Sequence, residues 1–115
     1  MGTRSHIGLM FDDGSIGWVY CHHDSDRNGK ILREHYDTPV KIMSIMRQGD
    51  MSSLGETIED CVFYTRDRHE PLENNEMHTQ TNEEEFLYVS EEDYTYLFKE
   101  GKWWSRKWKQ PLVED

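Results

Sequence analysis

The sequence predicts a single α+β domain over residues 1–115, with an antiparallel sheet of about five or six strands and one or two short helices packed on one face. Three observations predict this fold. Short runs rich in β-branched and aromatic residues lie near both ends of the chain. Two segments with helical apolar spacing lie between them. A chain of 115 residues is also long enough for one modest hydrophobic core.

The first strands are predicted at residues 5–11 and 16–22, where Ile, Leu, Val, Trp and Tyr are frequent. The tetrapeptide Asp12-Asp13-Gly14-Ser15 separates them. Gly14 adopts positive φ at little cost, so we expect a β-hairpin.

Helices are predicted between residues 29 and 48. Asn28-Gly29 interrupts the second strand, and the next apolar residues fall on one face of a short helix. Thr38 is suited to cap a second helix, Pro39 fits its first turn, and Gly49 suits its end.

The second half of the chain alternates strands and polar connections. We predict a loop at "GDMSSLGE", strands at 61–65 and 86–89, and a hairpin of 94–98 with 103–108. Residues 67–85 are polar and contain Pro71, which predicts a mobile surface excursion. The tail from residue 111 is predicted to fray.

Composition narrows the classes of function. The net charge of −10 and pI near 5.0 disfavour general nucleic-acid binding, because phosphate contacts need an excess of Lys and Arg. Two cysteines outside any CxxC pair fit a reducing cytoplasm. No apolar run is long enough to span a bilayer, so no membrane partner is expected.

The run "VYCHHDSDRNGKILREHY" concentrates metal-ligand types. Asp24, Asp26 and Asn28 match the first half of a calcium loop, but His35 stands at the twelfth position, where a carboxylate should close the site. For a transition metal, neighbouring donors such as Cys21 and His22 would point to opposite faces of a regular strand. We therefore predict no bound metal and no cofactor, and no catalytic residue.

Two other features allow a functional and a structural interpretation. Cys21 is adjacent to a histidine, but a thiolate needs a neighbouring cation or helix amino terminus that sequence adjacency does not supply. In "KEGKWWSRKWK", basic residues alternate with Trp103, Trp104 and Trp108. Such a segment can hold a base or a phosphate, or its tryptophans can pack the sheet while lysines protect the strand edge.

The segments "TRSHIGLMFDDGSIGWVYCHHD", "NGKILREHY", "GDMSSLG" and "YTYLFKEGKWWSR" together resemble a group of small proteins encoded by tailed bacteriophages and prophages. The resemblance covers most of the chain except residues 67–85. Members of the group have an aromatic residue where His23 stands and a Gly-aromatic pair in place of Ser25-Asp26. The resemblance implies a phage setting and no particular reaction.

We therefore expect a non-enzymatic phage accessory protein in the bacterial host cytoplasm, which binds and antagonises a host or anti-phage defence component. It would be either a protein-blocking inhibitor or a sponge for a small nucleotide signal, and self-association is left open. The alternative is a small metal-dependent hydrolase or nuclease centred on His22, Asp24 and His35. The strand-to-helix corner is either a pocket or a hydrogen-bonded scaffold. The candidate ligand- or partner-binding residues are Arg4, Tyr20, His22, Asp24, Asn28, His35, Trp103, Trp104 and Arg106.

Overall fold

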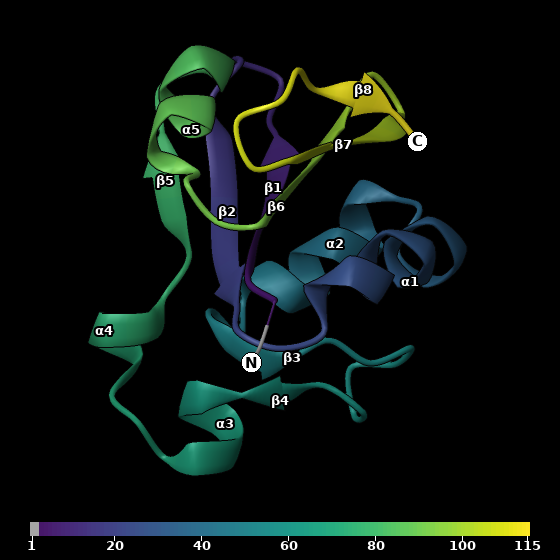
Figure 1. The fold of residues 1–115 in the computed structure, drawn as a ribbon. Helices are drawn as coiled ribbons and strands as arrows, with labels where there is room; N and C mark the ends of the chain where they lie inside the picture. Colours follow the sequence, from purple (N-terminus) through teal and green to yellow (C-terminus); the bar gives the residue numbers. More distant parts are fainter. Residues whose placement is uncertain (1–2) are drawn as a thin grey trace.

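The computed structural model describes residues 3–115 and begins with the expected hairpin (Figure 1). Strands β1 (Ser5–Met10) and β2 (Ile16–Cys21) are antiparallel, with Ile7 opposite Val19. Gly14 in the turn has a φ of 88°. The hairpin prediction is confirmed.

The α+β class is confirmed, but the sheet differs in detail from the expected antiparallel sheet of about five or six strands, because it has eight strands and is mixed. β1 is parallel to β6 (Tyr94–Lys99), and β2 is parallel to β3 (Met51–Ser53). The pattern of apolar residues in a strand does not determine whether the strand runs parallel or antiparallel to its neighbour. A parallel pair requires a long crossover connection, and the connection between β2 and β3 contains α1 and α2. The main strand order is β4-β3-β2-β1-β6-β7-β8, and β5 pairs with β2 outside this path. The remaining strands are β4 (Val62–Phe63), β5 (His78–Gln80), β7 (Lys102–Lys107) and β8 (Val113–Glu114).

Two helices cover one face of the sheet, as expected. A 3-10 turn, η1 (Ser25–Arg27), leads into α1 (Asn28–His35), and α2 (Pro39–Met46) follows. The Thr38 hydroxyl accepts the Lys41 amide at 3.3 Å, which confirms the predicted cap. The main core lies between these helices and the sheet and includes Ile7, Leu9, Val19, Leu32, Ile42, Ile45, Tyr96, Phe98 and Trp103.

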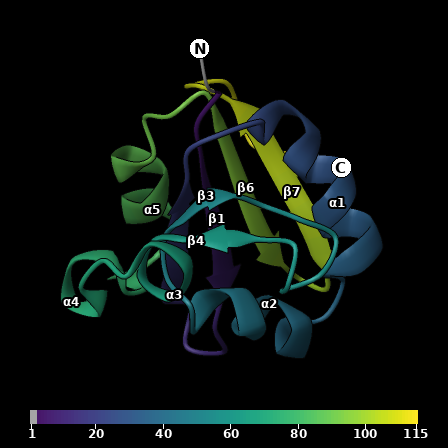
Figure 2. The same ribbon diagram turned by 90° about the horizontal axis from the view of Figure 1, so that it is seen from below.

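The opposite face is covered by α5 (Glu83–Val89), where a strand was predicted (Figure 2). The Asn82 side chain accepts the Glu85 amide at 2.9 Å, and glutamates fill the first turn, where the helix dipole favours negative charge. Phe86 is fully buried against Ile16 and Leu97. The prediction that helices cover only one face is therefore wrong.

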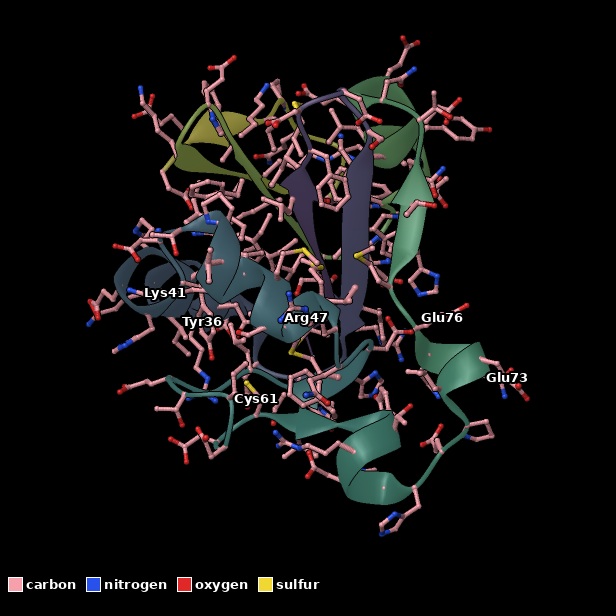
Figure 3. All side chains as sticks on the ribbon, turned by 180° about the vertical axis from the view of Figure 1, so that it is seen from behind. Tyr36, Lys41, Arg47, Cys61, Glu73 and Glu76 are labelled. Atoms are coloured by element: carbon pink, nitrogen blue, oxygen red, sulfur yellow. The ribbon has the colours of Figure 1, made fainter. Side chains whose placement is uncertain are left out.

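The polar segment 67–85 contains regular structure. It includes the end of α3 (Tyr64–Arg68), all of α4 (Leu72–Asn75) and strand β5, which is antiparallel to β2. Glu73 and Glu76 project outward from the region of α4 (Figure 3). The mobility expected for this segment stays a prediction.

The second expected hairpin is present. Phe98 in β6 lies opposite Trp103 in β7, and Glu100 and Gly101 both have positive φ in the turn. The tail expected to fray contributes β8, in which Val113 lies opposite Ser105. Among residues 3–115, no helix has both the length and the apolarity needed to cross a bilayer.

Candidate ligand-binding site

The nine candidate residues do not form one site. Arg4, Tyr20 and His22 lie at the same end of the β1–β2 pair, because Arg4 precedes β1 and His22 follows β2. The other six are distributed over the corner, the far end of α1 and the carboxyl-terminal hairpin.

At the corner, Asp24 is exposed and has a φ of 56°. Its side chain caps no amide and lies 3.8 Å from the Arg27 guanidinium. Asn28 is fully buried and donates its Nδ2 hydrogen to Cys21 Sγ at 3.4 Å. Asn28 thus serves the interior of the corner, whereas Asp24 faces solvent.

His35 lies at the last turn of α1, where its Nε2 is 3.6 Å from a Glu56 carboxylate oxygen. His22 instead follows β2, so the three residues of the hydrolase alternative have different neighbours. Among residues 3–115, no group of three or more His, Cys, Asp or Glu side chains is arranged to hold a metal ion.

The two tryptophans of β7 point to opposite faces of the sheet, as neighbouring strand residues do. Trp103 is buried in the main core and donates its indole hydrogen to the Tyr36 carbonyl at 2.9 Å. Trp104 lies on the α5 face, and the Lys99 ammonium lies over its indole, 4.8 Å from the ring centroid. On the same face, Arg106 donates to the carbonyls of Leu87 and Ser90 at 2.6 and 3.0 Å, so its guanidinium holds the end of α5 in place.

The three residues that do gather are joined by two from α3, Tyr64 and Arg68. We call Arg4, Tyr20, His22, Tyr64 and Arg68 the basic–tyrosine cluster. Its position follows from strand pairing: β3 lies beside β2, β4 lies beside β3, and α3 begins directly after β4. This arrangement brings residues more than 40 positions apart to one end of the sheet, near the amino terminus in Figure 1.

His22 is held by both its backbone and its ring. Its amide donates to the Met51 carbonyl at 3.1 Å, which extends the pairing of β2 with β3. The Tyr20 hydroxyl lies 2.6 Å from His22 Nδ1. If the hydroxyl is the donor, the neutral imidazole carries its proton on Nε2, which is then free to donate to a ligand.

The two arginines are available for an anion. Arg68 donates to the Ser52 hydroxyl at 3.2 Å and lies over the Tyr64 ring, 5.5 Å from its centroid. Within residues 3–115, neither Arg4 nor Arg68 forms an ion pair with a carboxylate, although the chain has 23 acidic residues. Arg27, Arg33 and Arg66 each pair with an aspartate, whereas Arg47 and Arg106 also lack a carboxylate partner in the described part of the chain, and Arg106 is bound to backbone carbonyls.

The electrostatics of His22 agree with this arrangement. Desolvation lowers the pKa of His22, and the nearby His23, Arg4 and Arg68 lower it further, against an opposing effect of Glu92. The imidazole is therefore predominantly neutral at pH 7. A bound anion would raise this pKa, because it would stabilise the imidazolium.

Next to the cluster, Trp18 is sandwiched between two imidazoles. Its ring centroid is 4.2 Å from that of His6 and 4.3 Å from that of His78. His6 is buried and its Nδ1 lies 3.0 Å from the Ser90 hydroxyl, and burial lowers its pKa to about 4. His78 lies 3.2 Å from the Asp50 carboxylate, which raises the pKa of His78. Of the two imidazoles that stack on Trp18, His6 is therefore neutral, whereas the surroundings of His78 favour its protonated form.

Tyr64 and Arg68 were not among the candidate residues predicted from the sequence. Tyr64 was assigned to a strand and Arg68 to the polar excursion, and nothing local to "YTRDR" indicates that α3 lies beside the end of β2. His78 was missed for the same reason. A comparison of the chain with protein-family models, with curated proteins and with solved structures found no match.

Proposed function

We propose that this protein is a non-enzymatic phage accessory protein that acts in the cytoplasm of the bacterial host, where it binds and antagonises a host or anti-phage defence component. In the form that the geometry supports best, the basic–tyrosine cluster sequesters a small phosphate-bearing ligand of the nucleotide class. The observation that carries the proposal is the pair of arginines, Arg4 and Arg68, that flank His22 without a carboxylate partner among residues 3–115.

The negative charge of the chain is the reason why two arginines without a carboxylate partner point to an anionic ligand. In a chain of net charge −10, exposed arginines have many carboxylates with which to pair. Guanidinium groups bind phosphate through two parallel hydrogen bonds, and a neutral imidazole adds a third donor. The rings of Tyr20 and Tyr64 supply aromatic surface beside these donors, which suits a ligand that carries a base as well as phosphate.

The test is calorimetric titration with ADP and with inorganic pyrophosphate. Compared with the wild type, the double variant Arg4→Gln/Arg68→Gln should bind ADP about tenfold more weakly, since two exposed ion pairs of up to about 1 kcal/mol each set a limit of about thirtyfold. The control is Lys41→Gln/Arg47→Gln, which removes the same charge from α2 and the residue that follows it (Figure 3). The control should bind as the wild type does.

A second measurement follows the imidazole directly. Saturating pyrophosphate should raise the pKa of His22 in a proton NMR titration, and this shift should be absent from Arg4→Gln/Arg68→Gln. Unchanged ADP affinity in that variant, or equal weakening in the control, would refute the proposal.

A second form, a protein-blocking inhibitor, is favoured by the outer surface of α5. Tyr88 is 83% exposed there, and hollows of about 520 and 370 Å³ lie on its two sides, lined in part by Glu84, Glu85 and Glu91. Arg106 and Lys109 also line the second hollow, so the acidic side is the one with Glu84 and Glu85. That side, next to an exposed tyrosine, suits a basic protein partner. Affinity capture from infected-cell lysate, with mass spectrometry of proteins and small molecules, separates the two forms. A captured protein lost in Tyr88→Ala supports the second form, and a captured nucleotide lost in Arg4→Gln/Arg68→Gln supports the first.

A further inference from the structure

A groove of about 630 Å³ lies on the face of the sheet opposite the basic–tyrosine cluster, between α1 and strands β6 and β7. Gly29, Lys30 and Arg33 line it from the helix, and Tyr94, Tyr96, Ser105 and Lys107 line it from the sheet, while residues 110–115 close one side. In Figure 1, α1 faces β7 and β8 near the carboxyl terminus. A volume of this size suits a small organic ligand.

The floor of the groove is aromatic. Tyr94 and Tyr96 share one face of β6, and their rings are parallel, with centroids 6.1 Å apart and an interplanar angle of 6°. Tyr96 is fixed because its hydroxyl donates to the Ser25 carbonyl at 2.6 Å. Tyr94 is only partly buried and opens toward the groove.

Gly29 keeps the helix close to this floor. A Cβ atom at this position would lie 3.1 Å from the Tyr96 ring and 3.3 Å from the Arg33 guanidinium. Both contacts are tighter than ordinary van der Waals contact, so a side chain here would intrude between the tyrosine and the guanidinium. The glycine therefore leaves an aromatic surface and a cation facing the same space.

Two carboxylates line the groove, Asp26 and Asp115, and Asp115 is the one that contacts Arg33. Asp115 Oδ2 lies 3.3 Å from the Arg33 guanidinium, and the Ser105 hydroxyl donates to Asp115 Oδ1. The Asp115 side chain is only 11% exposed, which shows how far it enters the groove. Three more cationic residues line the groove, Lys30, Arg106 and Lys107. The Arg106 guanidinium is bound to carbonyls at the end of α5, whereas within residues 3–115 Lys107 has no carboxylate partner.

We infer that this groove is a second binding site, for a ligand that joins a planar aromatic ring to an acidic group, and that the Asp115 carboxylate occupies the position of the ligand's acid until a ligand displaces it. The ring stacks on Tyr94, and the acid takes the place of Asp115 between Arg33 and Ser105. Lys30 and Lys107 supply the additional positive charge that a phosphate needs beyond a carboxylate. Asp115 is thus a competitor built into the chain.

The probe is AMP, titrated into the full chain and followed by the amide NMR signals of Tyr94 and Ser105. Asp115→Asn should bind AMP several-fold more tightly than the wild type, because the neutral amide competes less well for Arg33. Arg33→Gln should bind AMP at least tenfold more weakly. A thermal melt of each variant checks that it is folded.

Three further ligands distinguish the contribution of the aromatic ring to binding from that of the acidic group. Adenosine and inorganic phosphate should each bind more weakly than AMP, while 4-hydroxyphenylacetate tests whether a carboxylate replaces the phosphate. The control Lys41→Gln changes a lysine on α2 outside the groove and should leave AMP binding unchanged. The inference fails if Asp115→Asn does not tighten AMP binding, if Arg33→Gln does not weaken it, or if phosphate alone binds as well as AMP.

This test is independent of the proposal for the basic–tyrosine cluster. Arg4→Gln/Arg68→Gln should leave the signals of Tyr94 and Ser105 responsive to AMP, and Arg33→Gln should leave the pyrophosphate effect on His22 intact. Failure of one site therefore does not imply failure of the other.

Discussion

Phe86 and Tyr88 are two residues apart, and their contrast tests the assignment of α5. In a strand, residues i and i+2 point to the same face, so both would be buried or both exposed. In a helix they are about 200° apart. The structure places Phe86 at 0% exposure and Tyr88 at 83%. Truncating each side chain should therefore have very different effects.

The expected cost of Phe86→Ala is about 3–5 kcal/mol, as for other fully buried phenylalanines. With an unfolding entropy of about 2.1 cal/mol/K per residue, the 115-residue chain should lose about 4 °C in Tm for each kcal/mol. Phe86→Ala should thus melt about 12–20 °C below the wild type. Tyr88→Ala should stay within about 0.5 kcal/mol, or about 2 °C.

Thermal and urea unfolding followed by circular dichroism measure both variants, and the urea slopes check that each remains two-state. Similar losses in the two variants would indicate that α5 is not a helix packed through Phe86. A loss below about 1 kcal/mol for Phe86→Ala would refute the second core on this face.

Three other predictions concern buried and constrained positions. Burial lowers the pKa of His6 to about 4, whereas the unfolded chain titrates near 6.5, so acidification from pH 6.5 to 4 should remove up to about 3 kcal/mol of the free energy of unfolding. His6→Asn should flatten this part of the urea-unfolding profile, and an unchanged slope would contradict the assignment. Burial raises the pKa of the Cys21 and Cys61 thiols, so a thiol reagent should modify them only in denaturant; rapid modification of the native chain would argue against their burial. Gly49→Ala places a Cβ 2.1 Å from a backbone oxygen of α4 at a φ of +86°, whereas Gly101→Ala at +75° meets no atom within 4 Å. The first should cost well over the ~1 kcal/mol expected of the second, and equal melting temperatures would disprove this difference.

The elements predicted correctly from the sequence are those whose ends are set by one or two neighbouring residues. Thr38-Pro39 indicated the start of α2, Gly14 indicated the first hairpin turn, and the strand pattern of 94–98 and 103–108 indicated the second hairpin. The direction of β6 beside β1 has no local signal, because it depends on the path of the whole chain. Phe86 was assigned to a strand because a short apolar run fits either structure, and the cap at Asn82 was the signal that distinguishes them.

The same division applies to the site. Arg4, Tyr20 and His22 were among the residues predicted from the sequence, and the predicted hairpin brings the ends of β1 and β2 together. The divergence of Trp103 and Trp104 was also predictable, since adjacent strand residues alternate. The approach of Arg68 was not, because it depends on β3 and β4 being added beside β2.

The position of β1 in the sheet has a consequence for how the chain folds. Its two neighbours are β2, which follows after a short turn, and β6, which is nearly 90 residues away in sequence. During synthesis, one edge of β1 therefore has no partner until residues 94–99 leave the ribosome. Sequence-distant pairing of this kind slows folding and prolongs the exposure of strand edges that promote aggregation. We expect nascent chains that stop before β6 to depend on chaperones, because the centre of the sheet cannot close without residues 94–99.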